Sequence, residues 1–173
     1  QIARHIFDTL IDQDEKQRLR PALATSWKLV DESTWEFKLR EGVKFHDGTP
    51  FTAEDVVFSI QRAEKVPNSP SAFTIYTKAA KEVVAVDPTT VRIKTDGPYP
   101  LLPNDLSNIR IQSKKAAEGK STEDFNKGTA TIGTGPFKFV EWVPGDRLVL
   151  ERNDNYWGEK AEWARGIFQI GRA

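Results

Sequence analysis

Apolar and polar residues alternate along several short runs of the chain. In WEFKLR, at residues 35–40, an apolar residue occupies every second position and a charged residue follows each one. Successive side chains of a strand point to opposite faces, so this run predicts a half-buried strand of an antiparallel sheet. Similar runs occur in pairs, which predicts hairpins with turns at residues 31–33, 87–88 and 144–146. We expect the core to include Trp27, Trp35 and Trp142.

Apolar residues at helical spacing predict an amphipathic helix over residues 2–11. A second helix is predicted over residues 53–64, because Thr52 and Asp55 have the spacing of a capping box. A short helical stretch is expected near residues 113–118. The polar segments between these elements are predicted to be loops or turns: residues 12–18, 67–70, 101–113 and 118–129. Several hairpins with a few helices indicate an α+β domain with mixed or antiparallel sheets.

The adjacent residues His46 and Asp47, in the sequence HDGTP, raise the question of a catalytic dyad. Neighbouring side chains of an extended segment point to opposite faces, and no serine nucleophile motif accompanies the pair, so we interpret it as part of a turn. The run Gly133-Thr134-Gly135 lacks the lysine of a phosphate-binding loop and precedes a predicted strand, so it is also interpreted as a turn. We expect no catalytic residue, no cofactor and no enzymatic activity.

Composition narrows the class of protein further. Lysine plus arginine total 25 and aspartate plus glutamate total 25, so the formal net charge is zero and gives no electrostatic case for binding nucleic acid. No apolar run approaches the roughly 20 residues that span a bilayer. Two isolated histidines and no cysteine give no metal-ligand spacing, so we expect no metal site. Because methionine is absent, we expect the chain to be a piece of a longer protein.

Two segments carry side chains suited to a ligand surface. Phe73 and Tyr76 follow a proline-rich loop and lack a clear core pattern. Asn108 and Arg110 lie in a predicted loop and could hydrogen-bond a ligand. Each pair also has a plainer interpretation, since the aromatic residues could be packing residues and the polar pair ordinary solvated side chains.

The stretch PALATSWKLVDESTWEFKLREGVKFHDGTPFTAEDVVFSIQR resembles the signature region of the family 5 extracellular solute-binding proteins. This family includes the peptide, dipeptide and nickel-binding subunits of ABC importers. Three further elements follow in the family's order: VVAVDPTTVRIKT, GPYPLLPNDLSN and IGTGPFKFVEWVPGDRLVLERNDNYWG. The resemblance covers nearly the whole chain. It implies a fragment of a periplasmic-binding-protein-like fold (type II, cluster C), in which two lobes close over a ligand and an additional domain packs on the first lobe.

On this resemblance, residues 1–20 are the N-terminal part of the first lobe, residues 21–115 an inserted small α+β domain, and residues 116–173 the return into the first lobe. The second lobe is absent from this sequence. The function implied is that of the substrate-binding component of an ABC importer, which captures a peptide or similar small solute and delivers it to a membrane permease. Peptide is the default among dipeptides, longer peptides, sugars, opines and metal chelates. The implied location is periplasmic or extracellular, either free or tethered as a lipoprotein.

The family often has an aromatic ligand contact in the loop after the capped helix. The matching position here is Ser71, so Phe73 or Tyr76 would take the place of that aromatic residue. A second contact region of the family falls near residues 107–110. The resemblance and the residues together predict these ligand-binding positions: Ser71, Phe73, Tyr76, Ser107, Asn108 and Arg110.

We expect the chain alone to bind peptides weakly or not at all, because half of the cleft is missing. The alternative interpretation is a stand-alone interaction or structural domain that reuses the fold. A large exposed apolar patch, or dimerisation in solution, would indicate that alternative. An enzyme such as a hydrolase is a third class, and it would need a cluster of acidic, basic or nucleophilic residues that the sequence does not show.

Overall fold

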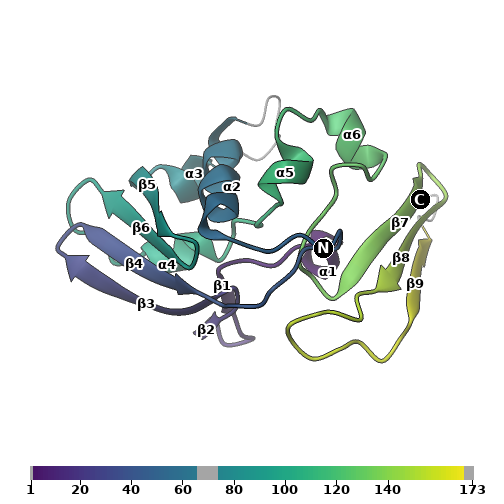
Figure 1. Ribbon diagram of the computed structural model, residues 1–173, viewed down its shortest axis with the longest axis horizontal. Coiled ribbons are helices and arrows are strands. Elements are labelled where there is room, and N and C mark those ends of the chain that lie inside the picture. The colour runs from purple at the N-terminus through teal and green to yellow at the C-terminus, as the bar shows by residue number, and fades with distance from the viewer. Residues whose placement is uncertain (1, 66–73, 170–173) are drawn as a thin grey trace. The chain divides into compact units, whose positions relative to one another are not determined.

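The computed structural model describes residues 2–65 and 74–169 (Figure 1). The chain divides into two compact units, each made from separate stretches of sequence. Unit 1 comprises Gln1–Asp8, Gly42–Phe51 and Gln112–Ala173. Unit 2 comprises Thr9–Glu41 and Thr52–Ile111.

A four-stranded antiparallel sheet forms the centre of unit 2, with strand order β3-β4-β6-β5. Its strands are β3 (Ala24–Asp31), β4 (Thr34–Leu39), β5 (Ala80–Asp87) and β6 (Thr90–Thr95). These strands confirm the two hairpins predicted around residues 31–33 and 87–88. Helix α2 (Ala53–Lys65) packs against β5 and β6.

The core of unit 2 uses one face of this sheet. Phe37 on β4 lies opposite Val91 on β6, and both are fully buried. Val56 and Ile60 of α2 are also fully buried. The alternation that predicted the strand therefore places its apolar side chains in the core, as expected for a sheet with one covered face.

Glu36 lies on the other face of the sheet, among the charged side chains of the predicted half-buried strand. Glu36 is only 6% exposed, because three cationic side chains surround its carboxylate. Arg92 Nε donates to Glu36 Oε2 at 2.8 Å, while the Nζ atoms of Lys28 and Lys38 lie 3.9 Å from Oε1. The hydrogen bond from Arg92 is the main cause that lowers the pKa of Glu36, so the carboxylate stays ionised.

The tryptophans are less buried than the alternation predicts. Trp27 and Trp35 are half-buried, and the indole Nε1 of Trp35 donates to the main-chain oxygen of Tyr99 at 3.1 Å. Trp142 is 36% exposed, so its placement in the core was wrong. An indole carries a large apolar body and a polar N–H, which makes such partly buried positions common for this side chain.

The predicted helix over residues 2–11 was largely wrong. Helix α1 covers only Ala3–Ile6, and Phe7 already has extended backbone angles. The chain after it is drawn into β-type hydrogen bonds, because Leu23 and Ala24 donate their N–H groups to the carbonyls of Thr9 and Leu10. Two short strands follow, β1 (Ile11–Gln13) and β2 (Leu19–Pro21), which pair as a hairpin.

Two further helices of unit 2 lie near the predicted ligand positions. They are α3 (Thr74–Thr77) and α4 (Leu102–Leu106), and α3 packs against both α2 and α4. The segment that contains α4, which includes Pro103, was predicted to be a loop. The structure shows why that was wrong: the proline lies at the start of the helix, where its missing N–H would be unpaired in any case.

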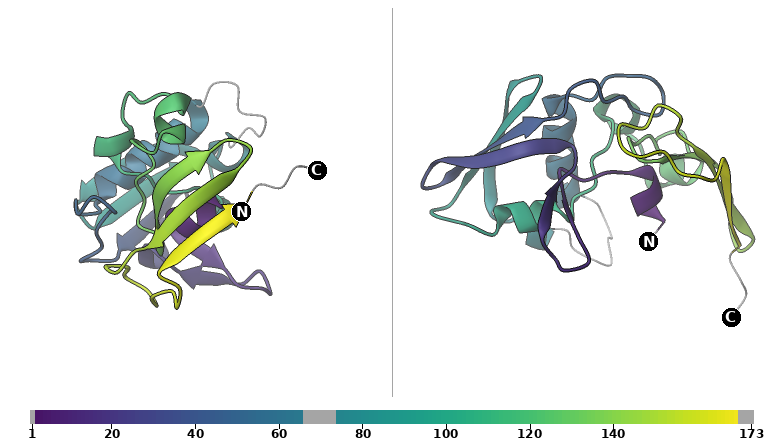
Figure 2. Two further views of the ribbon diagram at one scale, coloured as in Figure 1. Left: turned by 90° about the vertical axis from the view of Figure 1, so that its right-hand side faces the viewer. Right: turned by 90° about the horizontal axis from the view of Figure 1, so that it is seen from below.

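Unit 1 contains a three-stranded antiparallel sheet with the order β7-β8-β9, seen in the left view of Figure 2. Its strands are β7 (Phe137–Val143), β8 (Arg147–Arg152) and β9 (Arg165–Gln169). The hairpin of β7 and β8 confirms the prediction, whereas β9 was not predicted. Ile6 and Phe7 pack with Leu148 and Leu150 in a buried cluster.

Two short helices of unit 1 precede this sheet. Helix α5 (Lys114–Ala117) confirms the predicted helical stretch, and the hydroxyl of Ser113 accepts the N–H of Ala116 at its start. Helix α6 (Thr122–Asn126) lies in a segment that was predicted to be a loop. It begins with a complete capping box, in which the side chains of Ser121 and Asp124 each accept the other's backbone N–H. The polar composition of the segment concealed this signal.

Candidate functional site

His46 lies in a backbone turn of unit 1, as the sequence predicted. The Asp47 carboxylate accepts the N–H and the hydroxyl of Thr49 at 3.0 and 2.6 Å, and Gly48 has a φ of +85°. The ring of His46 points to the segment that contains Gly133 and Gly135. Its Nε2 lies 3.0 Å from the carbonyl oxygen of Gly135, and Gly133 N–H donates to Nδ1 at 3.4 Å.

These contacts define the charge state and the role of His46. A carbonyl can only accept, so Nε2 carries the proton and Nδ1 is the acceptor for Gly133. Burial lowers the pKa of His46, and the hydrogen bond to Gly135 and the charge of Asp47 oppose this only in part. Both ring nitrogens are thus engaged by main-chain groups, and the residue holds two segments of unit 1 together.

Asp8 is a second structural centre of unit 1, and sequence reasoning did not identify it. Its carboxylate accepts hydrogen bonds from the Thr134 hydroxyl at 2.9 Å, Trp157 Nε1 at 2.8 Å and the Tyr156 hydroxyl at 3.3 Å. The run NDNYWG supplies two of these three donors. The aspartate therefore fixes the loop after β8 against the glycine-rich turn before β7.

The predicted ligand positions of unit 2 begin at the C-terminal end of α4. The Ser107 hydroxyl donates to the carbonyl of Asn104 at 2.6 Å and accepts from Gln13 Nε2 at 2.7 Å. Asn108 is exposed, and its Nδ2 donates to the same Asn104 carbonyl at 3.3 Å. The hydroxyl of Ser107 is thus engaged in two hydrogen bonds within the protein. The side chain of Asn108 differs, because this residue is exposed to solvent.

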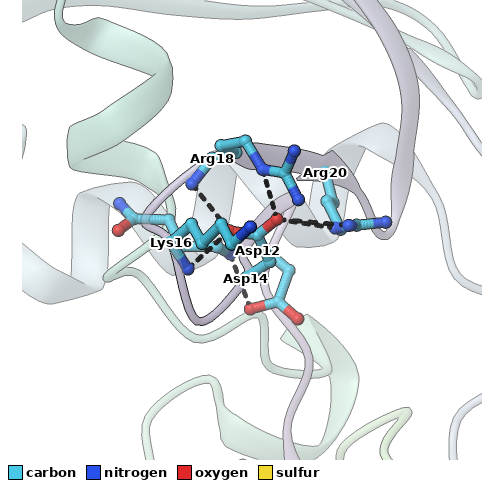
Figure 3. A network of polar contacts seen from close by, with 6 residues as sticks. Asp12, Asp14, Lys16, Arg18 and Arg20 are labelled. Atoms are coloured by element: carbon cyan, nitrogen blue, oxygen red, sulfur yellow. Dashed lines mark hydrogen bonds and ion pairs between the residues drawn. The ribbon is translucent and has the colours of Figure 1, made fainter.

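Gln13 is positioned by the β1–β2 hairpin, which is organised around Asp14 (Figure 3). The Asp14 carboxylate accepts the backbone N–H of Lys16 and of Arg18, each at 2.9 Å. It also accepts Arg18 Nε at 2.8 Å and Arg20 Nη2 at 3.1 Å. The backbone hydrogen bond from Arg18 is the main cause that lowers the pKa of Asp14. The ionised carboxylate closes the turn of the hairpin. It thereby fixes strand β1, whose Gln13 donates to the Ser107 hydroxyl.

Arg110 lies two residues beyond Asn108 and is half-buried. Its backbone forms an isolated antiparallel bridge with Thr9, whose hydroxyl donates to the carbonyl of Ile11 at 2.7 Å. Tyr76 is half-buried on α3, the helix that packs against α4. Arg110 itself lies beyond the end of α4, which is at Leu106. Ser71 and Phe73, the other predicted positions, lie outside the described residues.

The described residues show no further chemical centre of the kinds considered. Within residues 2–65 and 74–169, no group of three or more His, Cys, Asp or Glu side chains is arranged to hold a metal ion. No helix in that same part of the chain has the length and apolar character to cross a membrane. Of the predicted polar ligand positions, Asn108 is exposed and Arg110 is half-buried.

A family model and a similar protein of known function identify the same kind of protein. Residues 18–172 match the family of "Bacterial extracellular solute-binding proteins, family 5 Middle". The periplasmic murein peptide-binding protein MppA of Escherichia coli K12 is 33% identical over 174 residues, which cover 91% of this chain and 32% of that protein.

Solved structures share the fold as well. The crystal structure of NikZ from Campylobacter jejuni in complex with Ni(L-His) has a TM-score of 0.84 and 34% identity, over 96% of this chain and 34% of that chain. The periplasmic binding protein DppA from Helicobacter pylori in complex with the peptide STSA has a TM-score of 0.76 and 29% identity, over 95% of this chain and 36% of that chain. The chain thus spans about a third of the length of the relatives that it matches.

Proposed function

The chain belongs to the bacterial extracellular solute-binding proteins of family 5, and we propose that it forms part of the substrate-binding component of an ABC importer. In this proposal the complete protein captures a peptide or similar small solute outside the cytoplasm and delivers it to a membrane permease. The observation that carries the proposal is the family match over residues 18–172. The similarity to a murein peptide-binding protein and to a peptide-bound DppA supports peptide as the solute.

We propose that the two units correspond to two parts of the binding protein. Unit 1 would belong to the first lobe. Unit 2, which comprises Thr9–Glu41 and Thr52–Ile111, would be the inserted small α+β domain that was expected over residues 21–115. The second lobe would lie in the two thirds of the relatives' length that this chain does not span. A binding protein of this kind works by differential affinity, because the ligand favours the closed arrangement of the lobes over the open one.

Within unit 2, we propose that Arg110 and Asn108 contact the ligand directly. Asn108 is exposed, and the Arg110 guanidinium carries five donors that suit a carboxylate or a peptide carbonyl. Ser107 would act through position, because its hydroxyl already binds Gln13 and Asn104. Tyr76 would supply an aromatic surface from the neighbouring helix, together with Phe73 and Ser71.

The test uses the complete protein and calorimetric titration with alanine di-, tri- and tetrapeptides. We expect Arg110→Ala to weaken peptide binding about tenfold or more, because a charged hydrogen bond in a closed cleft contributes about 1.5–3 kcal/mol. Arg165→Ala removes an exposed arginine of unit 1 and serves as the matched control, with unchanged affinity expected. Equal affinity of the wild-type protein and the Arg110 variant would remove Arg110 from the site.

This proposal also covers activity and location. The relatives named above are binding proteins, and we propose that the complete protein has no catalytic activity and works in the periplasm or outside the cell. Intact recovery of the bound peptide after prolonged incubation would agree with this, whereas cleaved peptide would contradict it.

One observation favours the second candidate, a stand-alone interaction domain. Unit 1 exposes large apolar side chains near its edge strand β9, with Trp163 75% exposed and Ile167 58% exposed. Surfaces of this kind often form protein interfaces. Light scattering of the complete protein separates the two candidates, since a solute-binding component is expected to be monomeric with these residues covered. A dimer that is broken by Ile167→Asp would favour the interaction domain.

A further inference from the structure

Unit 2 contains a pocket of about 270 Å³ that shares no residue with the ligand positions proposed above. One wall comes from α3 and the chain after it, with Ile75, Lys78 and Lys81. A second wall comes from the end of β6 and the chain beyond it, with Thr95, Asp96 and Tyr99. Ligand pockets for drug-sized molecules are commonly about 300–1,000 Å³, so this one suits a smaller molecule.

The wall formed by the end of β6 is fixed by hydrogen bonds. Tyr99 donates its hydroxyl to Asp105 Oδ2 at 2.6 Å, and its main-chain oxygen accepts Trp35 Nε1 at 3.1 Å. Thr95 is buried, and its N–H donates to the carbonyl of Ser33 at 2.7 Å. The pocket therefore has a preformed side, which reduces the ordering that a ligand would require.

Three charged side chains border this pocket without a partner. In the part of the chain that the structure describes, Lys78, Lys81 and Asp96 form no hydrogen bond or ion pair through their side chains. Acidic residues elsewhere in unit 2 behave differently, since Asp14 and Glu36 are each bound by two or more cationic side chains. The pocket thus presents two ammonium groups and one carboxylate that remain available to a ligand.

The pocket also has an apolar lining residue, Ile75. Ile75 is 65% exposed, although isoleucine is among the side chains most often buried. It lies on the same wall as Lys78, so an aliphatic group could cover it while a carboxylate meets the lysines. Burial of such a group would contribute roughly in proportion to the apolar area removed from water.

We propose that this pocket binds a free aliphatic amino acid. The α-carboxylate lies between Lys78 and Lys81, the α-ammonium group meets Asp96, and the side chain covers Ile75. The pocket shares no lining residue with the peptide-binding positions of the proposed function. Its ligand would be a free amino acid rather than a peptide. Because its charges are exposed, binding weakens as the salt concentration rises.

The test follows the amide NMR spectrum of the full 173-residue chain during titration with L-leucine at millimolar concentrations. Saturable shifts are expected at Lys78, Lys81 and Asp96. N-acetyl-L-leucine, which lacks the ammonium group, and L-leucinamide, which lacks the carboxylate, are each expected to bind about fivefold more weakly. Equal binding of either compound would overturn the zwitterion assignment, and shifts centred on residues 107–110 would move binding to the other site.

Variants give an independent reading of the same titration. Lys78→Gln, Lys81→Gln and Asp96→Asn are each expected to weaken binding about fivefold while circular dichroism stays unchanged. Lys16→Gln removes an exposed lysine of unit 2 away from the pocket and is the matched control, with no change expected. Unchanged affinity in all three pocket variants, or no saturable shift in the wild-type chain, would overturn the proposal.

Discussion

Protonation of His46 is expected to destabilise unit 1, because the neutral ring uses both nitrogens. Nε2–H donates to Gly135, and Nδ1 accepts from Gly133 N–H. A second proton on Nδ1 would face the Gly133 N–H group and remove that acceptor. Burial, which lowers the pKa of His46, opposes the charge as well, and the cation of Lys138 acts in the same direction. Asp47 is the one nearby charge among these causes that favours protonation.

The sign and size of the effect follow from proton linkage. The pKa of His46 in the folded chain is below the ordinary value of about 6.5, which it regains on unfolding. Between these two pKa values the unfolded chain binds more protons, so stability rises with pH. The contribution is fully present above about pH 6.5 and is lost as the pH falls, with a slope of at most about 1.4 kcal/mol per pH unit for one group.

The assay is chemical denaturation of the wild-type chain and of His46→Gln from about pH 7.5 to about pH 5.5, a range that brackets the ordinary histidine pKa of about 6.5. The free-energy difference between the two should shrink as the pH falls, because the variant lacks the titrating group. A difference between wild type and His46→Gln that is constant, or that grows on acidification, would refute the reasoning.

Three further predictions concern stability. Gly133→Ala should destabilise the chain by about 2 kcal/mol or more in the same denaturation assay, because the added Cβ would collide with the main-chain oxygen of Ile6. Gly166→Ala is the control, because its added Cβ meets only an ordinary contact at 3.5 Å, and it should change stability by less than about 0.5 kcal/mol. Phe37→Ala should cost about 3–5 kcal/mol through the cavity it leaves, and a loss no greater than that of the exposed Val84→Ala would contradict the assigned core. Ser121→Ala should lower the stability of α6 by about 1 kcal/mol, since it removes the acceptor for Asp124 N–H, and unchanged amide hydrogen exchange over residues 122–126 would count against the capping box.

The hairpins were predictable because their information is local. Strand alternation and adjacent turn residues identified β3–β4, β5–β6 and β7–β8, and the spacing of Thr52 and Asp55 identified the start of α2. In the structure the Asp55 carboxylate accepts the N–H of Thr52 at 2.9 Å. Each of these elements depends on residues close together in sequence, so the pattern alone determines it.

Elements that depend on distant partners were missed. The apolar residues at 6, 7, 10 and 11 fit a helix, yet the chain there pairs with residues 23 and 24 and becomes extended. The hydrogen bond from Gln13 to Ser107 joins residues 94 positions apart, and that from Trp157 to Asp8 joins residues 149 positions apart. Local sequence patterns do not predict such distant partners. The hydrogen bonds around the predicted ligand residues were therefore visible only in the folded structure.

In the proposed function, this chain supplies one side of a peptide-binding cleft and the rest of the protein supplies the other. The most direct measurement is a calorimetric titration of one alanine tripeptide into two samples, the 173-residue chain and the complete protein that its gene encodes. We expect saturable binding by the complete protein and weak or no binding by the chain alone. Equal affinity of the two samples, or a complete protein that folds but does not bind the tripeptide, would contradict the proposal.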